Sequence, residues 1–306
     1  MNSKVYELII LGCGPAGITA AIYAARKKMD FIIISKDIGG QTIYSSEVEN
    51  YTGYQVITGA ELVFKFKEHL DMFDVELHMP EEVKKVSKQD DIIKVETDKD
   101  IYFSKTLIIA TGRIPRSLGV PNEEKFKGRG LTYCATCDAP LFRDKVVAVI
   151  GGGNSALDAA IQLTKYAKKI FLIDIASNLK ADPVMVKKAF DSGIVDYIKN
   201  SKVVEIIGSN FVEGIKILNL ENKKETILEL QGIFVEIGSF ASSQFIDIVE
   251  KTKDGEIIVD CANRTSKEGI FAAGDVTNVF AKQIIIACGE GAKAALSAYE
   301  YISKKF

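Results

Sequence analysis

The segment VYELIILGCGPAG, at residues 5–17, decides the fold that we expect for this chain of 306 residues. An apolar run ends there in a glycine-rich turn, and the small, helix-favouring residues ITAAIYAARKK and a second apolar run, FIIIS, follow it. Continuous apolar runs bounded by turns are typical of buried strands. The segment therefore predicts a strand, a turn, a helix and a second strand, which is the start of a nucleotide-binding βαβ fold.

The same order of features returns at residues 146–173, where VVAVI, the turn GGGNSA, a helical segment and IFLI follow one another. Alternating segments lie after each unit: DVELHM, DIIKVET and DIYFS in the first half, and VVEIIG, GIKILNL and ETILEL in the second. Such alternation predicts antiparallel strands. The expected fold class is α/β, with two Rossmann-like doubly wound nucleotide-binding domains that each carry a small antiparallel β meander.

Composition excludes several classes of protein. The chain has 39 basic and 41 acidic residues, a formal net charge of −2, so it lacks the basic excess of a nucleic-acid-binding protein. We find no apolar stretch long enough to span a membrane and no export signal, and we expect a cytoplasmic protein without membrane contact. Structural disulfides are rare in that compartment.

Each glycine turn has the spacing that a bound dinucleotide requires. The first glycine allows a tight turn, the second lets the backbone approach the pyrophosphate, and the third lets the helix pack closely on the strand. The pyrophosphate then lies at the helix N-terminus. One such match is often only a turn, but two in one chain predict two nucleotides. A tightly held flavin and an exchangeable pyridine nucleotide are the natural pair.

An acidic residue about 20 positions after the glycines usually binds the ribose hydroxyls. Asp174 directly follows the strand-like IFLI in the second unit, and a carboxylate there favours NADH because it repels the 2′-phosphate of NADPH. The alternative is that Asp174 only caps the end of the strand. In the first unit Asp37 is the one candidate, and it is a weak one.

Cys134 and Cys137 are the only cysteines of the five that lie close in sequence. Zinc would need further ligands, and the only histidines are His69 and His78, so we expect no metal. A CxxC pair in a reducing compartment is typical of redox chemistry, because two intervening residues allow a strained, reducible disulfide. Asp138 follows and could relay the proton of a thiol, or simply cap the turn before Pro140.

The segments GCGPAG, GGQTIYSSEVENYTG, ATGR, GRGLTYCATCDAPLF, VVAVIGGGNSALDAA and GIFAAGDV together resemble the low-molecular-weight thioredoxin reductases over essentially the whole chain. In the second half, LKADPVMVKKAF, GIFVEIG, GEIIVD and KQIIIACGEGAKAALSAYEYI are more similar to the flavoprotein subunit of alkyl hydroperoxide reductase. The resemblance implies an FAD-dependent NAD(P)H:protein-disulfide oxidoreductase that forms a homodimer. Electrons would pass from NADH through FAD and the cysteine pair to a thioredoxin- or glutaredoxin-like dithiol protein that supplies a peroxiredoxin.

The resemblance also assigns residues to roles. Cys137 would face the flavin, and Cys134 would attack the disulfide of the partner protein. The FAD-binding domain would comprise residues 1–113 and 247–306, and the NAD(P)-binding domain residues 114–246, with hinges at residues 113–127 and 238–246. The expected FAD-binding residues are Gly12, Gly14, Pro15, Ala16, Gly17, Gly40, Gln41, Asn50, Thr111, Gly112, Gly274, Asp275, Lys282, Gln283 and Ile284. The expected nucleotide-binding residues are Gly151, Gly153, Asn154, Ser155, Ala156 and Asp174.

The sequence departs from these relatives in three places. Thioredoxin reductases that use NADPH carry a His-Arg-Arg run where this chain has Asp174-Ile175-Ala176, with Lys180 in place of a further arginine, which again favours NADH. The chain begins at the first strand, without the thioredoxin-like extension of the alkyl hydroperoxide reductase flavoprotein, so we expect a separate acceptor protein. The segment EIGSFASS lacks the usual proline after IG. This keeps open a ferredoxin-dependent thioredoxin reductase, and a redox-inactive flavin-binding sensor is a further alternative.

Overall fold

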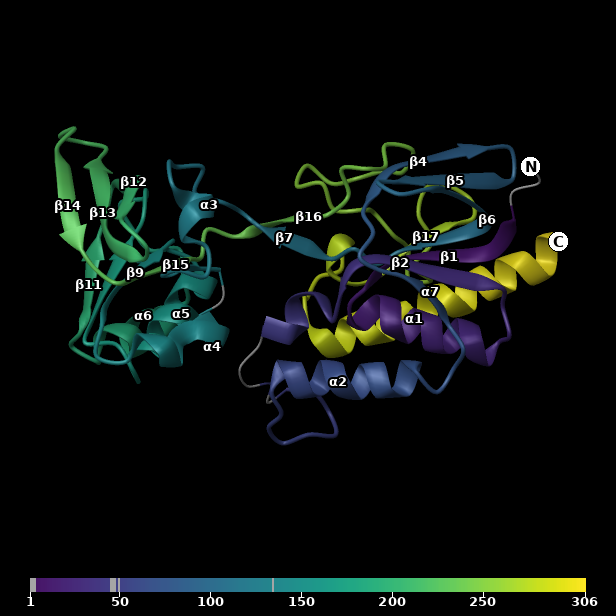
Figure 1. Ribbon diagram of the computed structural model, residues 1–306, viewed down its shortest axis with the longest axis horizontal. Helices are drawn as coiled ribbons and strands as arrows, with labels where there is room; N and C mark the ends of the chain where they lie inside the picture. Colours follow the sequence, from purple (N-terminus) through teal and green to yellow (C-terminus); the bar gives the residue numbers. More distant parts are fainter. Residues whose placement is uncertain (1–3, 45–47, 49, 134) are drawn as a thin grey trace. The chain divides into compact units, whose positions relative to one another are not determined.

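The computed structural model describes residues 4–44, 48, 50–133 and 135–306. The chain splits into two compact units, each described here by itself (Figure 1). The first unit comprises Met1–Ile114 and Phe240–Phe306, and the second comprises Pro115–Ser239. The chain crosses between them in two short strands, β7 (Arg113–Pro115) and β16 (Ser239–Ala241), which pair with each other.

The first unit is built on a sheet with the strand order β3-β2-β1-β6-β5-β4, in which β17 also pairs with β6. The strands are β1 (Val5–Cys13), β2 (Phe31–Ile38), β3 (Glu76–His78), β4 (Val83–Gln89), β5 (Ile92–Thr97), β6 (Ile101–Ile109) and β17 (Ile270–Ala272). Pairing is parallel from β3 to β6 and antiparallel from β6 to β4. Strand β6 joins both regions, because its first residues pair with β5 and its last with β17.

The alternation of side chains along β1 divides the core of the first unit into two layers. Leu8 and Ile10 face helices α1 (Pro15–Arg26) and α7 (Ile284–Lys305), with α2 (Gly59–Leu70) beside them on the same side of the sheet in Figure 1. Ile9 and Leu11 face the opposite side, where Val86, Ile93 and Val95 of the antiparallel strands cover the sheet. Burial on both faces explains the continuous apolar run that marked this strand in the sequence.

The second unit repeats this plan on a smaller scale. Its sheet is parallel throughout, with the order β11-β10-β9-β15-β8. Helices α4, α5 and α6 cover one face, and an antiparallel sheet, β12-β13-β14, covers the other. The bounds are β8 (Leu131–Thr132), β9 (Val146–Ile150), β10 (Lys169–Ile173), β11 (Val195–Ile198), β12 (Ser201–Gly208), β13 (Val212–Asn219), β14 (Glu225–Glu229), β15 (Gly232–Val235), α3 (Glu123–Phe126), α4 (Ala135–Asp138), α5 (Asn154–Leu163) and α6 (Pro183–Phe190). The expected fold class is confirmed.

Two details of the sequence-based prediction were wrong. The segment DVELHM does not begin the first meander: its core, β3, pairs in parallel with β2 at the edge of the main sheet. The missing antiparallel strand is β4, which only Val86 anchors by burial while its lysines are exposed. A strand with so few apolar residues gives a weak alternation signal.

The second crossing between the units also lies earlier than the expected boundary at residue 246. Residues 240–246 belong to the first unit, because Ala241 and Ile246 are buried in its core beside Val86. Ile246 forms a parallel bridge with Val86. The crossings, after Ile114 and after Ser239, lie inside the two segments predicted as hinges.

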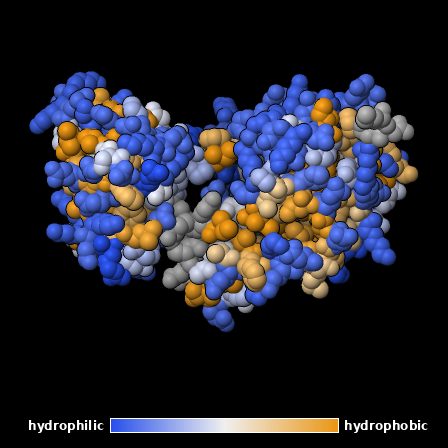
Figure 2. Space-filling model, in the orientation of Figure 1, coloured by the Kyte–Doolittle hydropathy of each residue, from blue (hydrophilic) through white to orange (hydrophobic). Residues whose placement is uncertain are grey.

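Most of the visible surface is hydrophilic, and hydrophobic residues gather mainly on the first unit in the view of Figure 2. Among its exposed large apolar side chains are those of Val56, Phe64 and Phe280. In the described part of the chain, no helix combines the length and apolar character needed to cross a membrane.

Helices α1 and α7 approach each other closely at a glycine. A Cβ on Gly291 would lie 2.1 Å from the carbonyl oxygen of Ala16 in α1, so the absence of a side chain sets the distance between the two helices. Gly289, on the exposed side of the same helix, has open space where a Cβ would stand. The two glycines therefore form a matched pair for testing this contact.

We expect Gly291→Ala to lower the free energy of unfolding by more than about 2 kcal/mol, because α7 must shift away from α1. Gly289→Ala should instead stabilise the protein by about 0.5–1 kcal/mol through helix propensity. Urea unfolding followed by circular dichroism measures both. Equal effects of the two substitutions would show that the helix contact is not close.

Candidate functional site

The first glycine turn, between β1 and α1, combines two tight backbone contacts with one open position. A Cβ on Gly12 would lie 2.4 Å from the Ala110 carbonyl oxygen, and one on Gly17 would lie 1.9 Å from the Gly12 carbonyl oxygen. Gly14 is different, because a Cβ there would meet no atom closer than 4.0 Å. Gly14 also caps α1 without a side-chain hydrogen bond. The N-terminus of α1 thus faces open space, where an anionic group would be stabilised.

Other predicted flavin-binding residues lie around this turn. Gly40, the first residue of the 3-10 turn η1 (Gly40–Tyr44), would place a Cβ 3.6 Å from the Cα of Gly14. Gly274, in η3 (Gly274–Val276), would place one 3.0 Å from the Cβ of Ala16. Pro15 is the first residue of α1, and Gln41 follows Gly40 in η1. The structure therefore brings three glycine-containing segments of the sequence to the start of α1.

A second group of predicted residues is tied together by hydrogen bonds at the start of α7. The Asn50 amide nitrogen donates to the Gln283 side-chain oxygen at 3.0 Å, and Gln283 is the N-cap of α7, directly before Ile284. The Thr111 hydroxyl donates to the Ser242 carbonyl oxygen at 2.6 Å, while the carbonyl oxygen of Gly112 accepts the Ser242 N–H at 3.0 Å.

Charged residues surround Asp275 in the same unit. Burial raises the pKa of the Asp275 carboxyl, and the positive charges of Lys282 and Arg113 oppose that rise. Both cations also contact Glu256: Lys282 Nζ lies 3.0 Å and Arg113 Nη1 2.8 Å from its Oε1. Sequence reasoning missed Glu256 and also Glu290, whose buried carboxylate accepts the Gly274 N–H at 2.9 Å. Both come from segments without a recognisable motif.

The second glycine turn repeats this arrangement and adds the predicted acidic residue. A Cβ on Gly151 would lie 2.2 Å from the Glu236 carbonyl oxygen, whereas Gly153, the N-cap of α5, has open space around it. A Cβ on Gly152 would lie 2.0 Å from Asp174 Oδ2. The Asp174 carboxylate therefore lies against the turn, as a ribose-binding residue would.

The remaining predicted residues of this turn begin α5. Asn154 is the first residue of the helix, Ser155 follows it, and Ala156 is buried against the sheet. The Asn154 side-chain oxygen accepts the Asp182 N–H at 2.8 Å, which attaches the start of α6 to this turn. The structure thus places all six predicted nucleotide-binding residues at the carboxyl ends of β9 and β10.

The cysteine pair belongs to the same unit. Cys134 lies outside the described residues, and Cys137 falls within α4, although its side chain is not described. Asp138 is the last residue of α4. Ala135 and Ala139 are buried in one cluster with Ala156 and Ala160 of α5. The segment of the cysteines is therefore packed on the helix that begins at the nucleotide turn.

Glu236 is a further polar residue at this site that sequence reasoning missed. It directly follows β15, and its carboxyl accepts the N–H of Ala135. Burial raises the pKa of Glu236 to about 7, and the negative charge of Asp158 adds to the rise. Its place after a buried parallel strand, like that of Asp174, was the signal that could have found it.

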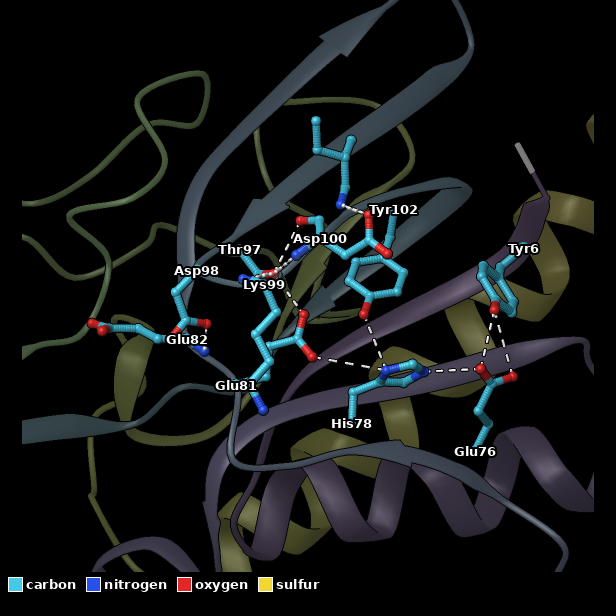
Figure 3. Close-up of polar contacts among 11 residues, drawn as sticks. Tyr6, Glu76, His78, Glu81, Glu82, Thr97, Asp98, Lys99, Asp100 and Tyr102 are labelled. Atoms are coloured by element: carbon cyan, nitrogen blue, oxygen red, sulfur yellow. Dashed lines mark hydrogen bonds and ion pairs between the residues drawn. The ribbon is translucent and has the colours of Figure 1, made fainter. Parts of the chain in front are cut away.

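A separate polar cluster in the first unit surrounds His78 (Figure 3). Its Nε2 lies 2.8 Å from Glu76 Oε1, and its Nδ1 lies 3.0 Å from the Tyr102 hydroxyl. The buried Glu81 accepts a hydrogen bond from Thr97 at 2.6 Å, and its Oε2 lies 3.8 Å from His78 Nδ1. Burial and Glu81 raise the pKa of Tyr102. Within the described ranges no group of three potential ligands could hold a metal ion, and these contacts instead join β3 to β6.

Comparison with known proteins places this geometry in a family. The model of the pyridine nucleotide-disulphide oxidoreductases matches residues 6–292. The chain belongs to this family. It is 41% identical over 303 residues to an alkyl hydroperoxide reductase subunit of Staphylococcus aureus (strain MSSA476), and the match covers 98% of the chain and 60% of that protein. It is 38% identical over 303 residues to a protein named NADH dehydrogenase of Bacillus subtilis (strain 168), and that match covers 98% of the chain and 59% of the relative.

The chain thus spans about 60% of the length of the curated relatives that it matches. Among solved structures, thioredoxin reductase of Lactococcus lactis superimposes with a TM-score of 0.84 at 35% identity, covering 98% of this chain and 99% of that one. The expected resemblance is confirmed, and the protein is an FAD-dependent oxidoreductase of the thioredoxin reductase type. The open position at Gly14 fits the approach of a dinucleotide pyrophosphate.

Gly14→Ala tests the open position directly. We expect the substitution to change the free energy of unfolding by less than about 1 kcal/mol, because the Cβ meets no protein atom, but to lower the FAD content strongly, because the methyl group occupies the approach to the turn. The absorbance ratio of flavin to protein measures FAD content. Gly53→Ala, at another glycine without neighbours, is the control. Full FAD content in Gly14→Ala would contradict the assignment.

Proposed function

We propose that this protein passes electrons from NADH through FAD and the Cys134–Cys137 pair to a thioredoxin- or glutaredoxin-like protein, and so supports a peroxiredoxin. The observation that carries the proposal is the packing of the cysteine segment on α5, the helix that begins at the nucleotide turn. The cysteine pair and the nucleotide site therefore share one unit, and each would exchange electrons with a flavin held at the turn before α1.

The residues of the first unit would hold and polarise the flavin. FAD, when bound, supplies the two-electron chemistry that links a nicotinamide to a disulfide. The N-terminus of α1 would bind the pyrophosphate, with Gly14 leaving room for it. The N-terminus of α7, at Gln283 and Ile284, carries partial positive charge that would stabilise negative charge on the bound cofactor.

In the second unit, Gly151–Ala156 would bind the nucleotide pyrophosphate, and Asp174 would accept hydrogen bonds from the ribose hydroxyls. Cys137 would be the sulfur on the flavin side, Cys134 would attack the disulfide of the partner protein, and Asp138 would hold or release the accompanying proton. Because both sites lie in one unit, we propose that they reach the flavin in turn, by rotation about the crossings at β7 and β16. The enzyme would be a cytoplasmic homodimer.

Asp174 should determine the preference for the nucleotide. We expect NADH to reduce the flavin at lower concentration than NADPH, and Asp174→Ala to raise the NADH concentration for half-maximal reduction about tenfold, because hydrogen bonds to a charged group are lost. Anaerobic stopped-flow absorbance of the flavin measures this. Asp191→Ala, on the exposed end of α6, is the control. An unchanged NADH dependence in Asp174→Ala would contradict the role.

Cys134 should be needed for the acceptor and not for the donor. We expect Cys134→Ser to keep reduction of the flavin by NADH and to lose more than about 99% of the reduction of a dithiol acceptor, because the attacking thiolate is gone. Coupled reduction of a thioredoxin-like protein measures the second step. Cys261→Ser, at an exposed free cysteine of the first unit, is the control. Acceptor reduction that survives in Cys134→Ser would exclude the pair as the route.

A second candidate donor is ferredoxin, and the segment at residues 236–243, without its expected proline, favours it. Reduction of the flavin by reduced ferredoxin, in a preparation that neither NADH nor NADPH can reduce, would replace the first proposal by this one.

A further inference from the structure

Glu236 is in contact with both parts of the second unit that the proposed function uses. Its carboxyl accepts the N–H of Ala135, the residue that directly follows Cys134 in the sequence. Its backbone carbonyl oxygen lies so close to Gly151 that a Cβ there would stand 2.2 Å away. Its own N–H donates to the Ile150 carbonyl oxygen at 2.8 Å. One residue thus joins the end of β15, the nucleotide turn and the start of the cysteine helix.

The surroundings of this carboxyl leave it sensitive to pH near neutrality. From α5, Asp158 faces it with a negative charge, and from α4 the N–H of Ala135 is its hydrogen-bond donor. The turn contributes backbone at Gly151. Burial and Asp158 raise the pKa of Glu236 to about 7, although the Ala135 N–H opposes them. Both the neutral and the ionised form are therefore populated near neutral pH.

We propose that Glu236 is a positioning residue for the dithiol: its carboxylate fixes the start of the cysteine helix at the nucleotide turn and, by its charge, sets how readily the neighbouring thiols react. This inference rests on the proposed function only for the meaning of the dithiol reaction. The contact itself joins Glu236 to Ala135 whichever donor supplies the electrons.

The sign of the effect follows from charge. An ionised Glu236 is the stronger hydrogen-bond acceptor for Ala135, but its negative charge disfavours a thiolate nearby, and the thiolate is the reactive form of cysteine. Glu236→Gln keeps an oxygen that can accept the Ala135 N–H and removes the charge. Its thiols should therefore ionise at lower pH than those of the wild type, with the fold intact.

Thiol alkylation tests this without nucleotide or partner protein. The full-length protein, with its flavin, is reduced by a phosphine and treated with iodoacetamide between pH 6 and pH 8.5, and mass spectrometry follows each cysteine. At pH 7.5, where wild-type Glu236 is mostly ionised, we expect at least one thiol of the pair to react about three to ten times faster in Glu236→Gln. Near pH 6 the difference should shrink, because the wild-type carboxyl is then mostly neutral.

Two controls separate this effect from a general change of structure. Glu229→Gln, at an exposed position of β14, should leave both rates unchanged. Cys261, exposed in the first unit, should react equally in every variant. Wild-type rates in Glu236→Gln at every pH would overturn the inference. A pH-independent increase would also overturn it, since loss of packing alone would produce that result.

The outcome is independent of the proposed function. A failure of NADH to reduce the flavin would contradict the proposed donor and leave the alkylation rates unaffected. If NADH does reduce the flavin, turnover with a dithiol acceptor gives a second readout: the wild type should show an ionisation near pH 7 in kcat that Glu236→Gln lacks. Persistence of that ionisation in Glu236→Gln would count against the role of Glu236.

Discussion

Close approach of backbone to backbone at the two glycine turns is the constraint on which both sites depend. At Gly17 and Gly151 a single added carbon would overlap a carbonyl oxygen, so each helix can start this close to its strand only because glycine stands there. The result is a helix N-terminus aimed at the edge of a parallel sheet, where partial positive charge accumulates. At Gly14 and Gly153 the same turns leave open space in front of that charge.

The second unit shows how one helix can serve two reactions. Helix α5 begins at the nucleotide turn, and its small side chains, Ala156 and Ala160, provide the surface on which α4 packs. Small residues on that surface allow the short cysteine helix to lie close to the sheet edge. Asp174 and Glu236, each after a parallel strand, place two carboxyl groups at that edge. Asp174 lies against the turn, while Glu236 faces the cysteine segment, so the two carboxyl groups have different roles.

Sequence patterns predicted the parts of this structure that depend on local chemistry. The glycine turns, the buried strands β1 and β9 and the position of Asp174 follow from residue types at fixed spacing. The pairing of β3 with β2 could not be predicted, because a segment of three residues gives the same alternation in a parallel edge as in a meander. Strand β4 escaped notice because the sheet, and not its own composition, holds it. Residues 240–246 join the first unit only through the burial of Ala241 and Ile246, a tertiary contact that no local pattern marks.

The central claim is that flavin and dithiol exchange electrons within one protein. Each is a two-electron couple, so an anaerobic titration with NADH, followed by flavin absorbance and by counting free thiols, tests the claim most directly. The account predicts that full reduction consumes about two equivalents of NADH per chain and exposes two new thiols, whereas Cys137→Ser consumes about one. Full reduction of the wild-type flavin by one equivalent, with no new thiols after further NADH, would contradict it.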